Sequence, residues 1–278
     1  MISSCAVVLT YPPHFFQTVL TLTTLKQWCN EITHITVIID DLSEFSNSTY
    51  LDNCQKTYGS LCNQIVLVSE SLPELRILKS QPWIRQQMIK LLLDKIILTD
   101  NWLFSDGDIR FTGKIPTSGI ISSRTKFAGV PLEQRDPGPG ETSAQILFYI
   151  RHMLDPTFPG FWDNEGRVIT ASHPPIHLME RNTIHSLRAF LENKFSKPIE
   201  MIHKDLSNDT RMATSEWDLI EAYKQLVLKQ HPNWNFEFDE FFEAAWSSDR
   251  ELGLDWFHTR GLVPAQDIWQ SLPMVKYL

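Results

Sequence analysis

The sequence predicts an α/β fold in which a mostly parallel central sheet is flanked by helices. Strand-like and helix-like segments alternate over roughly the first hundred residues. The strand candidates are nearly continuous apolar runs, as expected of strands buried on both faces. With 278 residues and 42% hydrophobic residues, the chain can bury one large core, so we expect a single elaborated domain over residues 1–278.

The first strand and helix are marked by a change in the spacing of apolar residues. Residues 6–10 form an apolar run that Tyr11 and two prolines stop. From residue 15 to residue 29, apolar side chains recur at three- and four-residue intervals, which predicts a helix with one buried face. Together these segments make a first β-α unit.

The next segments repeat this pattern. Residues 35–39 and 65–68 are β-branched runs that polar residues close. Residues 83–98 carry apolar side chains at helical spacing and lead into a strand that ends at Asp106. Because ligands of open sheets bind beyond the carboxyl ends of the strands, the residues that close these runs are candidate ligand contacts.

The second half of the chain predicts an irregular region. Residues 136–140 read Asp-Pro-Gly-Pro-Gly, a loop rich in helix and strand breakers that we interpret as a lid. We expect the segment at 241–246 to return to the central sheet. The other elements expected are strands at 127–132 and, interrupted, at 169–178, and helices at 180–195 and 215–228.

Composition limits the partners. A net charge of −8 and a pI near 5.6 argue against a nucleic-acid binder, whose affinity depends on clustered Lys and Arg. No apolar run reaches the roughly 18 to 20 residues of a transmembrane segment and no signal peptide is visible, so we expect a cytoplasmic protein. The cysteines form no disulfide framework and are interpreted as reduced core thiols: Cys5, Cys29, Cys54 and Cys62.

The most informative motif is Asp106-Gly107-Asp108, at the end of a predicted strand. On extended backbone the two carboxylates point to the same side, and Gly107 leaves room for a ligand to approach the main chain. Mn²⁺ and Mg²⁺ prefer carboxylate oxygens, and Mg²⁺ commonly takes one or two of them together with substrate phosphate oxygens. The pair therefore predicts a Mn²⁺ or Mg²⁺ site that serves a diphosphate. Read alone, the tripeptide is also compatible with a polar turn.

The order of these elements resembles the nucleotide-sugar half of the GT-A fold glycosyltransferases. The resemblance rests on residues 83–90, the strand 102–105 with its acidic pair, and the downstream blocks 172–175 and 214–218, which are similar to small bacterial and large-virus members. It implies a GT-A-like fold with a nucleotide-sugar-binding half (1–120) and an acceptor-binding half (121–278). It also implies transfer of a sugar from a nucleotide-diphosphate donor, of the UDP-sugar type, to a hydroxyl of a glycan.

The resemblance assigns roles on the donor side. Asp106 and Asp108 match the DXD motif that chelates Mn²⁺ or Mg²⁺, and Arg85 matches a basic residue of the preceding helix that faces the donor. Residues at the ends of the first strands occupy the places that contact uracil and ribose, where an aromatic face and a carboxylate suit the ligand: Thr10, Tyr11 and Asp40. Tyr11 is equally compatible with an ordinary aromatic residue at a strand end.

The acceptor side needs a general base if the transfer inverts the anomeric centre. Glu216 is our first assignment, with Asp218 as the alternative, and Trp217 between them is interpreted as a sugar platform or a core residue. Ser215-Glu216-Trp217-Asp218 also fits a helix start, where a serine cap and acidic residues in the first turn are favoured in any case.

Two C-terminal residues complete the expected site. In GT-A enzymes a C-terminal histidine often returns to the metal, which implies His258 as a third ligand, and Arg260 is placed to bind phosphate oxygens. Both also fit a surface loop near the C terminus.

Two other functions remain open at this point. A phosphohydrolase of the haloacid dehalogenase type uses an Asp-x-Asp motif followed by a threonine, here Thr112, but that motif belongs on the first strand. A catalytically inactive module of the same fold would bind nucleotide or glycan without turnover.

Overall fold

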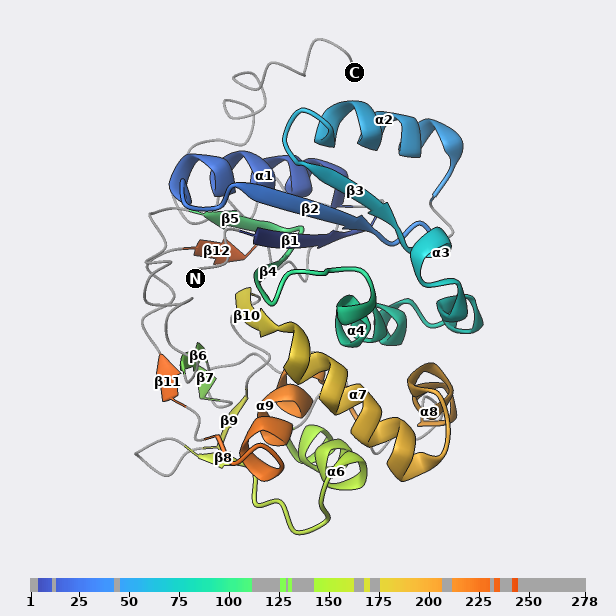
Figure 1. Cartoon of the computed structure of the whole chain (residues 1–278), viewed down its shortest axis with the longest axis vertical. Helices are drawn as coiled ribbons and strands as arrows, with labels where there is room; N and C mark the ends of the chain where they lie inside the picture. Colours follow the sequence, from blue (N-terminus) through green and yellow to red (C-terminus); the bar gives the residue numbers. More distant parts are fainter. Residues whose placement is uncertain are drawn as a thin grey trace.

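The computed structural model describes residues 5–11, 14–42, 46–111, 126–128, 130–131, 143–162, 168–170, 176–206, 212–230, 233–235 and 242–244. Within these ranges the chain forms a central sheet with helices packed on both of its faces (Figure 1). The expected α/β class, with a mostly parallel sheet, is confirmed.

The described part of the central sheet has five strands in the order β10-β4-β1-β2-β3. Strands β1, β2, β3 and β4 are mutually parallel where they pair, and β10 runs antiparallel to β4 at one edge. Their bounds are β1 Cys5–Thr10, β2 His34–Ile39, β3 Gln64–Leu67, β4 Asn101–Asp106 and β10 Ile176–Glu180.

The strand order reverses beside β1. The chain proceeds from β1 to β2 and β3 on one side and then returns to place β4 on the other side of β1. The register pairs Leu9 of β1 with Asp106 of β4, so the carboxyl ends of the two strands lie next to each other. This is a topological switch point, where open α/β sheets bind their ligands.

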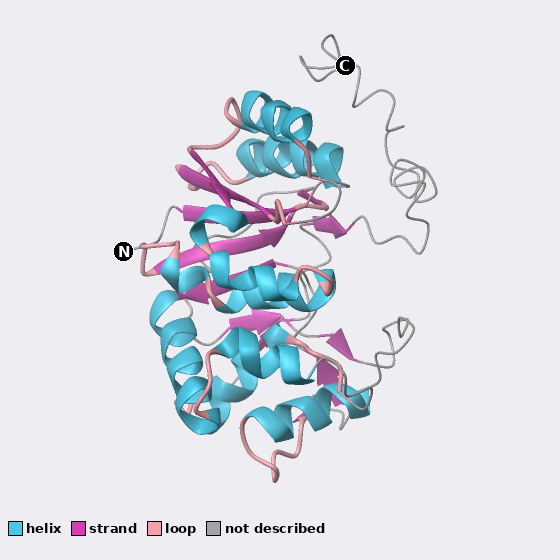
Figure 2. Ribbon diagram, turned by 90° about the vertical axis from the view of Figure 1, so that its right-hand side faces the viewer, coloured by secondary structure: helices cyan, strands magenta, loops and turns pink. Residues whose placement is uncertain are grey.

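The sheet separates two apolar clusters, because successive side chains of a strand face opposite sides. Val8 of β1 packs with α1 and α2 on one face, and Leu9 packs with α4 and α9 on the other. Figure 2 shows helices on both sides of the strands. These helices span α1 Phe15–Trp28, α2 Ser48–Tyr58, α4 Pro82–Leu91 and α9 Glu216–Leu226.

The remaining elements are short or belong to the second half. Three small sheets pair β11 with β6, β12 with β5, and β7 and β8 with β9. The helical elements are α3 Val68–Ser71, η2 Pro73–Leu78, η3 Leu93–Lys95, α6 Ser143–Met153, α7 Arg181–Phe195 and α8 Ile199–Leu206. The strands are β5 Ile109–Phe111, β6 Lys126–Ala128, β7 Val130–Pro131, β8 Phe161–Trp162, β9 Val168–Thr170, β11 Asn233–Asn235 and β12 Phe242–Ala244.

Four element predictions need correction. The strand expected at 127–132 divides into β6 and β7, which pair in different sheets. The helix expected to reach residue 98 ends at Leu91 and continues as a 3-10 turn, where Arg188 of α7 binds the Asp94 carboxylate. The segment expected to return to the central sheet forms β12, which pairs with β5 instead. The interrupted strand divides into β9 and β10, which lie in different sheets. The expected lid at 136–140 lies outside the described residues.

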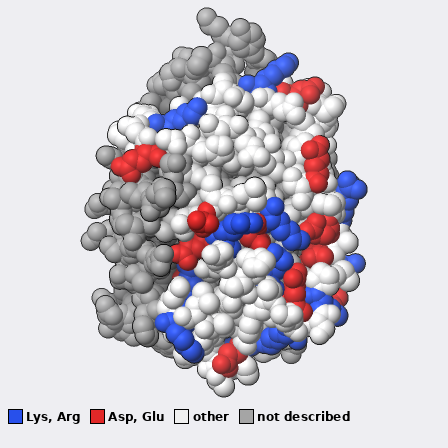
Figure 3. Space-filling view, viewed as in Figure 1, with Lys and Arg blue, Asp and Glu red and all other residues white. Residues whose placement is uncertain are grey.

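The charged residues, the cysteines and the helices bear on what the composition predicted. On the face drawn in Figure 3, Lys and Arg side chains lie among Asp and Glu side chains. The ion pairs of the described residues include Lys197 with Asp205. All four cysteines are free thiols, as expected. None of the helices that the structure describes combines the length and apolarity that a membrane crossing needs.

A buried histidine joins two helices of the second half. His203 of α8 is 1% exposed, lies 2.7 Å from the Tyr149 hydroxyl through Nε2 and 2.9 Å from the Ile199 carbonyl oxygen through Nδ1. Burial lowers the pKa of His203 to about 4, against the opposing effect of the Ile199 carbonyl. Because the unfolded chain would bind a proton near pH 6.5 and the folded one would not, this histidine destabilises the fold as the pH falls toward 4.

We expect His203→Gln to weaken the acid sensitivity of the fold. Between pH 7 and pH 4.5 the free energy of unfolding of the wild type should fall by about 2–3 kcal/mol more than that of the variant. Urea unfolding at several pH values measures this difference. The exposed His34 offers the control, since His34→Gln should keep the wild-type slope. Parallel slopes for the wild type and His203→Gln would contradict the prediction.

Candidate functional site

The acidic pair lies at the switch point. Strand β4 ends at Asp106, and Gly107 and Asp108 form the turn into β5. The side chains of Asp106 and Asp108 are 29% and 19% exposed, so both reach the surface. The position expected from the sequence, beyond the carboxyl end of a buried strand, agrees with the structure.

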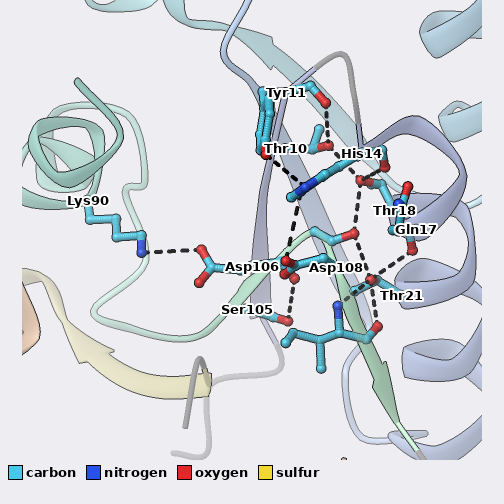
Figure 4. A network of polar contacts seen from close by, with 12 residues as sticks. Thr10, Tyr11, His14, Gln17, Thr18, Thr21, Lys90, Ser105, Asp106 and Asp108 are labelled. Carbon is cyan, nitrogen blue, oxygen red and sulfur yellow. Dashed lines mark hydrogen bonds and ion pairs between the residues drawn. The ribbon is translucent and has the colours of Figure 1, made fainter. Parts of the chain in front are cut away.

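The geometry of the pair differs from the expectation. Gly107 and Asp108 lie in a turn, so the alternation of extended backbone does not apply; Figure 4 shows Asp106 directed toward Lys90 and Asp108 toward His14. A Cβ on Gly107 would stand 2.6 Å from Thr18 Oγ1 and 2.9 Å from the Leu9 carbonyl oxygen. The space in which a side chain of residue 107 would lie is therefore filled by the protein, so the room expected beside Gly107 is absent on that side. A contact of Gly107 with a ligand stays a prediction.

Threonine side chains of α1 contact the backbone of the turn that contains Gly107 and Asp108. The Thr18 hydroxyl lies 3.1 Å from the Gly107 carbonyl oxygen, and the Thr21 hydroxyl lies 3.0 and 2.6 Å from the carbonyl oxygens of Gly107 and Ile109. Figure 4 shows Thr18 and Thr21 beside Asp108. Thr24 accepts a hydrogen bond from the backbone of β5. Sequence reasoning missed this row, although a threonine at every third position of an apolar helix was its visible signal.

Tyr11, directly after β1, and His14, the N-cap of α1, lie next to the acidic pair. The Tyr11 hydroxyl lies 2.8 Å from His14 Nε2, and His14 Nδ1 lies 4.0 Å from Asp108 Oδ2. Burial, followed by the charge of Asp106, raises the pKa of Asp108 to about 7. Thr10, expected on the donor, is 1% exposed and its hydroxyl bonds to Thr18 at 2.6 Å.

Lys90 connects the acidic pair to the second half of the chain. Its Nζ lies 2.7 Å from Glu216 Oε1 and 3.2 Å from Asp106 Oδ1. The ammonium also lies 5.2 and 5.1 Å from the ring centroids of Phe104 and Trp217. Burial alone would lower the pKa of Lys90, but the charges of Asp106 and Glu216 raise it, so Lys90 is a buried cation. A lysine in the last turn of a helix is common for electrostatic reasons, so its position did not indicate a role in the site.

Glu216, the expected general base, is part of this cluster but is not accessible. It is 3% exposed, and burial raises its pKa while Lys90 opposes that effect. Asp218, the alternative base, is 1% exposed next to the Ser215 cap of α9. Trp217 is 3% exposed and stacks on His177 with ring centroids 3.7 Å apart, so it is a core residue and not a sugar platform.

Arg85 and Asp40 bind each other inside the protein. Arg85 Nε donates to both Asp40 oxygens at 2.9 and 3.0 Å, and Nη1 donates to the carbonyls of Leu78 and Lys79. Both side chains are 1% exposed. Neither reaches a surface from which it can contact a donor, so the roles expected of them are not supported, and the pair fixes the end of β2 against α4. His258 and Arg260 lie outside the described residues.

The carboxylates of Asp106 and Asp108 suit a hard divalent cation whose remaining ligands come from a substrate. Among the described residues, no three His, Cys, Asp or Glu side chains gather closely enough to hold a metal ion. Asp106 and Asp108 offer carboxylate oxygens at the surface, which fits Mg²⁺ or Mn²⁺ with phosphate oxygens completing the coordination.

The solved structures compared with the chain include three glycosyltransferases of low sequence identity. No protein-family model matches the chain, and no curated protein matches its sequence. Mouse xyloside xylosyltransferase 1 is similar over 96% of this chain and 93% of its own, with 9% identity and a TM-score of 0.46. The PaToxG glycosyltransferase (82% and 70%) and the S. cerevisiae mannosyltransferase Ktr4p (68% and 60%) each show 10% identity and a TM-score of 0.43. Because these TM-scores are below 0.5, the functional inference rests on the geometry of the site itself.

We expect Lys90→Met to destabilise the protein by about 3–5 kcal/mol, because it leaves the buried Glu216 carboxylate without its cation. Lys90→Met combined with Glu216→Gln should recover part of this loss, since no buried charge is then unpaired. Urea unfolding measures both effects. Lys95→Met removes a more exposed ion pair with Glu74 and should cost no more than about 1 kcal/mol. Equal costs for Lys90→Met and Lys95→Met would contradict the buried role.

Proposed function

We propose that the chain is a metal-dependent glycosyltransferase, which transfers a sugar from a nucleotide-diphosphate donor of the UDP-sugar type to a hydroxyl of a glycan acceptor. One observation carries the proposal. The acidic pair Asp106 and Asp108 reaches the surface at the switch point between β1 and β4, where open α/β sheets bind nucleotides.

The residues at this point match the parts of such a donor. Asp106 and Asp108 would hold Mn²⁺ or Mg²⁺, which supplies positive charge for the departing diphosphate. Tyr11, half-buried at the carboxyl end of β1, offers an aromatic face for the nucleobase. Strand β10 and helix α9 come from the second half of the chain, so the expected acceptor half borders the same site.

The alternatives are less consistent with the geometry. In a haloacid dehalogenase type of phosphohydrolase the Asp-x-Asp motif follows the first strand, whereas here it follows β4. Thr112, the threonine that follows the motif in such a phosphohydrolase, lies outside the described residues. A metal at the acidic pair would also offset the charge of a departing diphosphate, a step that a module without turnover lacks, so we place the inactive module second.

We expect Asp106→Asn and Asp108→Asn each to lower Mn²⁺-dependent turnover of UDP-sugars by about 100-fold or more, because each removes a carboxylate from the metal. Hydrolysis of a panel of UDP-sugars, with and without Mn²⁺, measures this without a known acceptor. Asp52→Asn, on the exposed side of α2, is the matched control and should keep wild-type rates.

The same assay separates the alternatives. Wild-type turnover in both variants would contradict the proposal. Hydrolysis of simple phosphoesters, with UDP-sugars left intact, would favour the phosphohydrolase. Binding of UDP-sugars that needs no metal and leads to no turnover would favour the inactive module.

We further propose that the transfer inverts the anomeric configuration with a general base other than the buried Glu216 and Asp218. Glu216 is bound to Lys90 and 3% exposed, so an acceptor hydroxyl does not reach it in this structure. Glu216→Gln should therefore lower turnover by less than the ~100-fold or more that loss of a general base costs, since glutamine still accepts a hydrogen bond from Lys90. NMR of the product anomer and the rate of Glu216→Gln test both statements. A product with retained configuration would exclude inversion.

A further inference from the structure

We propose that Lys90 makes metal binding at the acidic pair depend on the donor. Its ammonium competes with the divalent cation for Asp106, and the diphosphate of the donor shifts that competition toward the cation. The inference rests on the proposed function, because it concerns the cation of the same site. It goes further by assigning to Lys90 control over when the ion binds.

The first support is the direction of the two carboxylates. Lys90 Nζ lies 3.2 Å from Asp106 Oδ1, and Figure 4 shows Asp106 directed toward Lys90 while Asp108 is directed toward His14. Within the described ranges, no three His, Cys, Asp or Glu side chains are grouped to hold a metal ion. An ion that binds both aspartates must therefore share Asp106 with Lys90 or draw it away from Lys90.

The second support is that Lys90 is held by partners other than Asp106. Its Nζ lies 2.7 Å from Glu216 Oε1, closer than to Asp106, and 5.1 and 5.2 Å from the ring centroids of Trp217 and Phe104. If Asp106 turns to an ion, the ammonium keeps a carboxylate and two aromatic faces. The exchange therefore leaves no buried charge without a partner.

The third support is the difference in exposure across the contact. The side chains of Lys90 and Glu216 are 7% and 4% exposed, whereas that of Asp106 is 29% exposed. Burial keeps the ammonium in place, and the surface position makes the Asp106 carboxylate accessible to an ion. Asp106 is therefore the member of the contact that can change its partner.

Electrostatics gives the direction of the effect. Lys90 and a divalent cation are both attracted to Asp106 and repel each other, and salt screens charges in a partly buried site only weakly. An ion that arrives alone meets this repulsion, whereas a diphosphate brings negative charge that offsets it. We expect the chain to bind Mn²⁺ about tenfold or more tightly with UDP than without it.

The test measures Mn²⁺ binding to the full chain, not turnover, through the EPR signal of the free ion. Titrations are run with and without UDP and corrected for the Mn²⁺ that UDP binds by itself. The variants Glu216→Gln and Lys90→Met with Glu216→Gln differ only at Lys90. Loss of the ammonium should make the double variant bind Mn²⁺ alone about tenfold more tightly than Glu216→Gln does, with a smaller gain from UDP.

The sign of this change distinguishes competition from a structural role. Neither variant leaves a buried charge unpaired, because Lys90 keeps Asp106 in Glu216→Gln and both charges are removed in the double variant. A site loosened by the loss of Lys90 would bind the ion more weakly, not more tightly. Lys95→Met, which removes a more exposed ion pair with Glu74, is the control and should bind Mn²⁺ as the wild type does.

Two outcomes would overturn the inference alone. One is a double variant that binds Mn²⁺ no more tightly than Glu216→Gln does, and the other is a wild type that binds Mn²⁺ equally well with and without UDP. The proposed function then stands, because the turnover of Asp106→Asn and Asp108→Asn tests it separately. If the wild type binds no Mn²⁺ even with UDP, both the inference and the proposed function fail.

Discussion

The buried ammonium of Lys90 is the interaction on which the site depends. It lies between Asp106, at the end of β4, and Glu216, at the start of α9, two residues that the sequence separates by more than a hundred positions. A buried carboxylate is costly unless a cation pairs with it, so α9 docks where Lys90 can serve both acids. The same contact fixes the direction of Asp106, and the second half of the chain thereby becomes part of the site.

Asp108, the other aspartate of the pair, is positioned by helix α1 and not by Lys90. Helix α1 packs its threonines so closely under the turn that only glycine fits at position 107. Asp108 therefore faces His14, while Asp106 faces Lys90. An acidic pair that looks symmetrical in the sequence has two different environments, a buried cation on one side and an imidazole on the other.

Local sequence patterns predicted where the strands end but not which residues the strand ends contact. Apolar runs identified β1, β2 and β4, and the position of Asp106 followed because a polar residue closes a buried strand. Arg85 and Glu216 were misjudged for one reason: spacing along a chain says nothing about a partner that is distant in sequence. Arg85 is bound by Asp40, 45 positions earlier, and Glu216 by Lys90, 126 positions earlier.

The balance of charge explains why such a site would need a cation before any chemistry. Three carboxylates and one ammonium meet at the end of β4, which leaves a negative site when all are ionised. Burial, followed by the charge of Asp106, raises the pKa of Asp108 to about 7. A diphosphate approaching alone would be repelled by the same carboxylates. In the proposed function, a divalent cation would neutralise the site and attract the phosphates. Metal and donor would then strengthen each other's binding, and the metal would act at donor binding as well as at departure of the leaving group.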